Sequence, residues 1–170
     1  LCYGFIRAAF IADNRKLCPF CRTPAATSAG ETLQRIKKRA EAGDAIAIHM
    51  LGHYNCSGNM GVSQDVDKAM ELWLRSGELG YAASYFNIGN SYYTGRGVES
   101  DMKKAVHYWE LAAMKGDVDA RYNLGIMEGN AGNYDRAAKH WMISAGAGFD
   151  ESLEQIRQCF MAGLVTKDDF

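Results

Sequence analysis

Proline is almost absent from this sequence. The only two, Pro19 and Pro24, both lie within the first 24 residues. Proline interrupts helices because its nitrogen carries no hydrogen and its ring clashes with the preceding turn. From residue 25 onward nothing of that kind breaks a series of helices, and the composition shifts at the same point. We therefore place a domain boundary near residue 28.

Neither sign of charge dominates, and no long hydrophobic run is present. Nineteen basic and twenty acidic residues give a net charge of -1, so no bulk field favours a nucleic-acid or anionic-membrane partner. No apolar run approaches the ~20 residues that cross a bilayer. We therefore expect neither nucleic acid nor membrane among the partners. The chain starts at Leu1 without a Met, so we expect it to be a piece of a longer protein.

Cysteines are too few and too irregular for a disulfide framework. There are five of them, an odd number, whereas a secreted disulfide scaffold carries more of them in pairs. This favours a reducing, intracellular compartment, with the cytoplasm as the expected location. Cys56 and Cys159 are expected to be small buried packing residues.

Motifs for catalysis are also lacking. There is no G-x-S-x-G nucleophile elbow and no phosphate-binding glycine loop. His49 and His53 share one helical face at a spacing that could hold a metal, but no glutamate follows His49 and no third ligand is evident. We interpret this pair as solvent-facing or part of a binding surface. The sequence predicts no catalytic residue, no cofactor and no small-molecule substrate.

What the sequence does contain is an internal repeat. The segments GDAIAIHMLGHY, GYAASYFNIGNS and GDVDARYNLGIM align with one another, and their Leu-Gly or Ile-Gly pairs recur at spacings of 37 and 36 residues. A tryptophan follows in each copy, as Trp73, Trp109 and Trp141, on the inner stripe expected of a second helix. The expected repeat units cover approximately residues 44–80, 81–116 and 117–148.

Residues that cap helices recur at matching places in each copy. Asp65, Asp101 and Asn133 stand where a helix N-cap belongs, and Gly58 and Gly95 stand where a helix ends. Two helices per unit follow, with one flanking helix at either end. The expected helices span residues 30–42, 45–57, 66–78, 82–94, 102–115, 118–129, 134–146 and 150–162.

The pattern A-x3-LG-x2-Y-x2-G-x-GV-x2-D-x2-KA-x3-W resembles the Sel1-like repeat family, which is related to tetratricopeptide repeats. The resemblance extends from residue 31 to about residue 163. It implies an all-α fold, a right-handed α-α superhelix (solenoid) of antiparallel helix pairs, that serves as an adaptor in protein complexes. Two features depart from the pattern. Asn55 and Cys56 replace the tyrosines of the second copy, and the third copy lacks the G-x-GV loop.

The front segment, residues 1–27, carries a C-x2-C pair. Cys18 and Cys21 in LCPFCRTP resemble the last part of a RING finger, the zinc cross-brace of ubiquitin ligases. Cys2 would then belong to the other zinc, and Phe5 stands where its companion ligand is expected. Tetrahedral zinc needs four ligands, so we expect no metal in this chain unless an upstream RING is present. The segment is interpreted as a RING-like remnant or linker, and residues 28–170 as the solenoid.

The leading functional hypothesis is a protein- or peptide-binding scaffold. Solenoids bind partners along exposed positions of the first helices, and the amides of Asn87 and Asn123 fall at the same repeat position. These amides either grip the backbone of an extended peptide or hold neighbouring repeats together. The alternative hypothesis is the substrate receptor of a RING-type ubiquitin ligase whose zinc domain lies mostly upstream. The candidate partner-binding residues are Met50, His53, Asn87, Asn90, Asn123 and Ile126.

Overall fold

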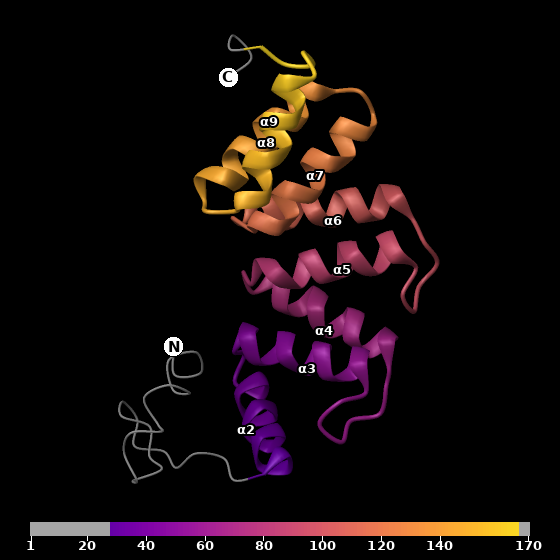
Figure 1. Ribbon diagram of the computed structural model, residues 1–170. Coiled ribbons are helices and arrows are strands. Elements are labelled where there is room, and N and C mark those ends of the chain that lie inside the picture. Colours follow the sequence, from indigo (N-terminus) through magenta and orange to yellow (C-terminus); the bar gives the residue numbers. More distant parts are fainter. Residues whose placement is uncertain (1–27, 167–170) are drawn as a thin grey trace, which may run out of the picture.

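The computed structural model describes residues 28–166, and every regular element in that range is an α-helix. The eight helices stack in a gently bowed row from α2 at one end to α9 at the other (Figure 1). The all-α prediction is confirmed, and each helix end lies within one residue of its predicted place. The helices are α2 (Ala29–Glu41), α3 (Ala45–Ser57), α4 (Val66–Glu78), α5 (Ala82–Thr94), α6 (Met102–Met114), α7 (Val118–Asn130), α8 (Tyr134–Gly146) and α9 (Asp150–Met161).

Side-chain caps fix where several helices begin. Asp65 accepts a hydrogen bond from the backbone N–H of Lys68 at 2.9 Å, and Asp101 accepts one from Lys104 at 3.0 Å. Each bond satisfies one of the amides that a first helical turn leaves free. Both predicted caps are confirmed.

The predicted cap at Asn133 is wrong in its chemistry. Asn133 does precede α8, but its side chain makes no capping bond. Its Nδ2 instead donates to Glu128 Oε2 at 2.7 Å, across the short loop between α7 and α8. A hydrogen bond to a carboxylate is stronger than one between neutral groups, and this bond orients the Asn133 amide toward Glu128.

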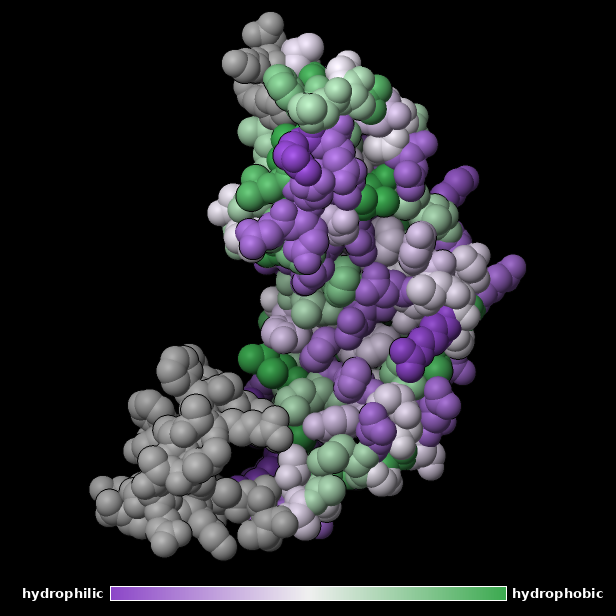
Figure 2. Space-filling model, viewed as in Figure 1, coloured by the Kyte–Doolittle hydropathy of each residue, from purple (hydrophilic) through white to green (hydrophobic). Residues whose placement is uncertain are grey.

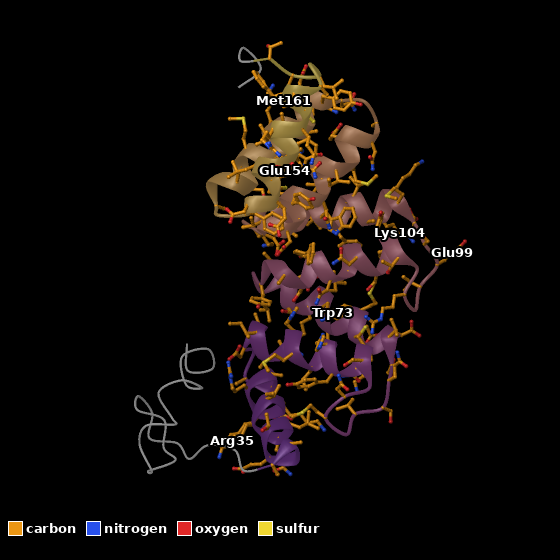
Figure 3. All side chains as sticks on the ribbon, viewed as in Figure 1. Arg35, Trp73, Glu99, Lys104, Glu154 and Met161 are labelled. Atoms are coloured by element: carbon orange, nitrogen blue, oxygen red, sulfur yellow. The ribbon has the colours of Figure 1, made fainter. Side chains whose placement is uncertain are left out.

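A tryptophan seated on a glycine joins the two helices of every unit. A Cβ built on Gly89 would lie 2.5 Å from Trp109 Cδ1, so only glycine lets the indole lie this close to the helix backbone. The three tryptophans are 2–3% exposed. Figure 3 shows Trp73 inside the row of helices, whereas Glu99 and Lys104 lie at its edge. The pairs are Gly52–Trp73, Gly89–Trp109 and Gly125–Trp141.

Packing within a unit is more extensive than packing between units. Helices α3 and α4, α5 and α6, and α7 and α8 form the largest interfaces. The buried residues fall into three successive clusters along the row, not one central core. Each part of the chain therefore contacts chiefly its neighbours, as in other solenoids.

The two flanking helices occupy repeat positions without the tryptophan contact. Ile36 on α2 stands at the position of Trp73 and is 1% exposed. Arg157 on α9 stands at the position of Gly125, and its guanidinium pairs with Glu154 at 3.0 Å. Because this position on α9 carries a side chain, a tryptophan cannot pack against the α9 backbone as it does against α3, α5 and α7.

None of the helices within residues 28–166 is both long and apolar enough to cross a membrane. The RING-like segment, with Cys18 and Cys21, lies outside the described residues, as does any helix after Thr166. The division at residue 28 stays a prediction.

Candidate functional site

An open groove of about 390 Å³ lies between the first helices of units 1 and 2. Its walls come from α3 and α5, its floor from α4, and one end from the loop after α5. A groove of this size can take several side chains of an extended peptide. Its lining residues are His53, Cys56, Ser57, Trp73, Asn87, Asn90, Ser91, Thr94 and Arg96.

The structure brings three of the predicted binding residues together here. His53, Asn87 and Asn90 all line the groove. Asn123 occupies the same repeat position as Asn87 but lies one unit further along, half-buried on α7. Met50 and Ile126 are partly buried and pack against core clusters.

Asn90 has a structural contact that its sequence position does not reveal. The indole N–H of Trp109 donates to Asn90 Oδ1 at 3.0 Å. An indole nitrogen can only donate, so the atom facing it must be the amide oxygen, and the Nδ2 group points elsewhere. At the equivalent position the third unit has Ile126, and within residues 28–166 the indole N–H of Trp141 has no acceptor.

His49 differs from the expectation of a solvent-facing pair. His53 is exposed, but His49 lies half-buried on α3 with its Nδ1 2.9 Å from Ser84 Oγ on α5. Ser84 Oγ donates to Ser76 Oγ at 2.8 Å, and Ser76 Oγ donates to the carbonyl of Ala45 at 2.7 Å. Since the Ser84 proton is already used, Nδ1 must be the donor and His49 is the Nδ1–H tautomer.

This chain of hydrogen bonds joins units 1 and 2. Burial, with a smaller contribution from nearby His53, lowers the pKa of His49 from its ordinary 6.5 to about 4. The serine–histidine pair does not have the geometry of an activated nucleophile. Ser84 is fully buried, and the imidazole donates to its hydroxyl instead of accepting from it.

The potential metal ligands of the described helices are dispersed, and their cysteines are buried. Within residues 28–166 no three His, Cys, Asp or Glu side chains are gathered to hold a metal. Cys56 and Cys159 are buried free thiols, as predicted. Burial raises the pKa of the Cys159 thiol, which disfavours the reactive thiolate.

Arg96 is a charged groove residue that was not predicted from the sequence. It stands between Gly95 and Gly97, in the loop that repeats as G-x-G, and its backbone N–H bonds the carbonyl of Ser91 at 3.1 Å. The repeat pattern treats the residue between these glycines as variable. That variability was the available signal, because variable positions of a repeat are those that the core does not determine.

The chain resembles several known proteins along these helices. The family model for the Sel1 repeat matches residues 45–81, 82–117 and 118–148, which agree with the predicted units to within about one residue. A crystal structure of a Sel1 repeat protein from Oxalobacter formigenes superposes with a TM-score of 0.75 at 28% identity, covering 81% of this chain and 58% of the other. A protective antigen of uropathogenic Escherichia coli with an SLR fold gives a TM-score of 0.71 at 31% identity, covering 79% of this chain and 30% of that one.

Curated relatives share part of the same region. The ERAD-associated E3 ubiquitin-protein ligase component HRD3B of Arabidopsis thaliana is 32% identical over 98 residues, which are 57% of this chain and 15% of the relative. Chitin synthase regulatory factor 3 of Schizosaccharomyces pombe is 27% identical over 81 residues, 48% of this chain and 9% of that protein. The chain thus corresponds to a small part of these relatives. With three matched units, paired helices and solved structures of the same architecture, the chain belongs to the Sel1 repeat family.

Proposed function

We propose that the chain is a non-catalytic scaffold or adaptor that binds a protein or peptide partner along its first helices. The groove between α3 and α5 is the observation that carries this proposal, because equivalent positions of two successive units meet in it. Extended ligands suit such a surface, since each unit offers the next part of the ligand a similar contact.

The relatives favour the same class of function. One curated relative is named as a component of a ubiquitin-protein ligase and another as a regulatory factor of chitin synthase. Residues 28–166 contain neither a gathered metal-ligand set nor an activated serine. Binding therefore accounts for the described surface better than catalysis does.

The test is the double substitution Asn87→Ala and Asn123→Ala. A partner is first isolated with the whole chain as bait, and its affinity is then measured by calorimetry. Loss of two amide contacts should weaken binding by about 1–3 kcal/mol in total, roughly five- to a hundredfold. Within residues 28–166 neither amide makes a hydrogen bond to another side chain or to the backbone, so the melting temperature should stay nearly unchanged.

Gln34→Ala provides a matched control, because it removes an exposed amide on α2, away from the groove. It should leave affinity unchanged. If the double variant melts early yet binds normally while folded, the two asparagines hold repeats together, and the proposed binding surface is wrong.

A second proposal is that the parent protein is a ubiquitin-ligase component with this array as substrate receptor. It is favoured by the name of the Arabidopsis relative, a ubiquitin-protein ligase component, and by the Cys18–Cys21 pair. A chain extended upstream of Leu1 should then hold about two zinc ions. Absence of zinc from that longer protein would remove the RING part of this proposal.

A further inference from the structure

The groove between α3 and α5 carries positive charge without any balancing carboxylate. None of its nine lining residues is acidic, and Arg96 is the one with a permanent charge. Among the described residues, the arginine side chains that form ion pairs are those of residues 35, 39, 136 and 157, so Arg96 is not neutralised by a neighbour. An anionic group entering the groove would meet an unpaired guanidinium.

The hydroxyl groups of the groove have already used their protons. Ser57 Oγ donates to the carbonyl of His53 at 2.8 Å, and Ser91 Oγ donates to that of Asn87 at 3.0 Å. Thr94 Oγ1 donates to the carbonyl of Asn90 at 2.8 Å. Toward a ligand these hydroxyls therefore offer little as donors.

The nitrogen groups, in contrast, remain uncommitted. Asn90 Oδ1 is held by the Trp109 indole, which leaves the two hydrogens of Asn90 Nδ2 for another acceptor. The amide of Asn87 and the Arg96 guanidinium line the same groove and make no side-chain hydrogen bond within residues 28–166. The exposed His53 ring adds a further N–H. The groove thus presents several donors and one positive charge, which is the complement of a carboxylate.

The shape of the groove suits a carboxylate on a short apolar stem. Trp73 and Cys56 contribute apolar surface beside the polar atoms, and both are nearly fully buried, so they form its base. The groove is open to solvent, so an extended segment can lie in it. On the face drawn in Figure 2, hydrophobic residues lie in small separate groups between hydrophilic ones.

We propose that this groove binds the side-chain carboxylate of an Asp or Glu in an extended segment of the partner protein, an inference that rests on the proposed scaffold function. The preference should belong to this groove alone. At the corresponding place in the third unit, Ile126 replaces Asn90, and the loop that supplies Arg96 is absent. One acidic residue of the partner would therefore fix its register on the array.

An acetylated and amidated ten-residue oligoglutamate is a suitable probe, because all its carboxylates are on side chains. Binding to the full chain is followed by NMR, using the side-chain signals of Asn87, Asn90 and Arg96. We expect saturable shifts at these three residues, no such shifts with amidated oligoglutamine or oligolysine, and weaker binding as salt rises from about 0.05 to 0.5 M.

Variants separate the groove from general electrostatics. Arg96→Gln should weaken oligoglutamate binding about fivefold or more, and Arg96→Lys should weaken it less, since it keeps the charge but loses the bidentate geometry. Arg75→Gln is the matched control. It removes the same charge from an exposed position on α4 outside the groove, and should change affinity less than about twofold.

Three results would overturn the proposal. Equal losses in the two glutamine variants would mean that net charge, not the groove, attracts the probe. Shifts caused by oligoglutamine with a free C-terminus, but not by amidated oligoglutamate, would assign the groove to a terminal carboxylate. Absence of binding by oligoglutamate would exclude an acidic side chain, while the scaffold function would still be judged by the asparagine double variant and the isolated partner.

Discussion

Glycine in the middle of a helix normally weakens it, yet the first helix of each of the three repeat units keeps one at the same place. Gly52, Gly89 and Gly125 each lie against an indole ring, so the side chain they lack is replaced by a neighbour's. Gly146, at the end of α8, has nothing within 4 Å of the place where a Cβ would be. The same residue type therefore has opposite roles at these positions.

Gly89→Ala should consequently destabilise the protein by about 1–3 kcal/mol, because its methyl group would overlap Trp109 and press on the carbonyl of Ala105. Gly146→Ala should be neutral or stabilising by up to about 1 kcal/mol, since alanine is the better helix former. Urea denaturation of both variants measures the two effects. If both variants change the free energy of unfolding equally, the contact between Gly89 and Trp109 does not require a glycine.

Asn90 illustrates what repeat spacing does not reveal about a single residue. Its position marks it as a candidate for partner binding, but its amide oxygen also satisfies the indole of Trp109. Asn90→Ala should therefore cost about 1–3 kcal/mol of stability by leaving a buried N–H unpaired. Asn87→Ala should stay within about 0.5 kcal/mol.

Thermal unfolding of these two variants, followed by circular dichroism, compares their stabilities directly. A stable Asn90→Ala variant would show that water replaces the lost acceptor. In that case the Asn90 side chain would be available for ligand binding alone.

At the scale of the helices, the sequence predicted ends and faces well because both depend on local signals. Aspartate caps and left-handed glycines concern residues close in sequence, and the 36–37-residue spacing indicates where they recur. Each helix end was placed within one residue. Contacts between helices were harder to predict from the sequence. Asn133 bonds Glu128 instead of capping, and His49 bonds Ser84 on another unit. Both outcomes depend on which side chains the packed helices bring together.

The His49–Ser84–Ser76 chain joins three helices and should make stability depend on pH. The folded protein keeps His49 neutral down to a pKa of about 4, whereas the unfolded chain binds a proton near 6.5. Because the unfolded state takes up the proton first, this contribution is fully present above about pH 6.5 and is lost as the pH falls toward 4.

Melting temperatures of the wild type and of His49→Gln, measured between pH 7 and pH 4, test this dependence. The wild type should lose more stability than the variant over that interval. His107→Gln, on the exposed side of α6, serves as the control and should follow the wild type. Parallel curves for wild type and His49→Gln would mean that His49 does not titrate on unfolding in this range.

For the whole molecule, stability is distributed along the row. The three buried clusters succeed one another from α2 to α9, so each depends mainly on adjacent helices. The Ser28 hydroxyl already caps α2, accepting from Glu31 N at 3.1 Å. The domain boundary at residue 28 stays a prediction, which a deletion can test.

Deleting residues 1–27 should accordingly shift the melting temperature by no more than about 2 °C, which corresponds to less than about 1 kcal/mol for a chain of this size. Differential scanning calorimetry of the full and shortened chains measures the shift. A large loss of helicity on deletion would place the front segment within the folded array and move the boundary.

The pairing of each glycine with a tryptophan has a consequence for how such arrays change over evolutionary time. Both partners of a pair lie in the same unit, as with Gly89 and Trp109. Duplication or loss of a whole unit therefore keeps every tryptophan together with the glycine that it packs against. The loop between the two helices has varied in length, from residues 58–65 in the first unit to 131–133 in the third, while the helices kept their register. Gene duplication can thus lengthen the surface offered to partners one unit at a time, and each new groove can then diverge in the residues that line it.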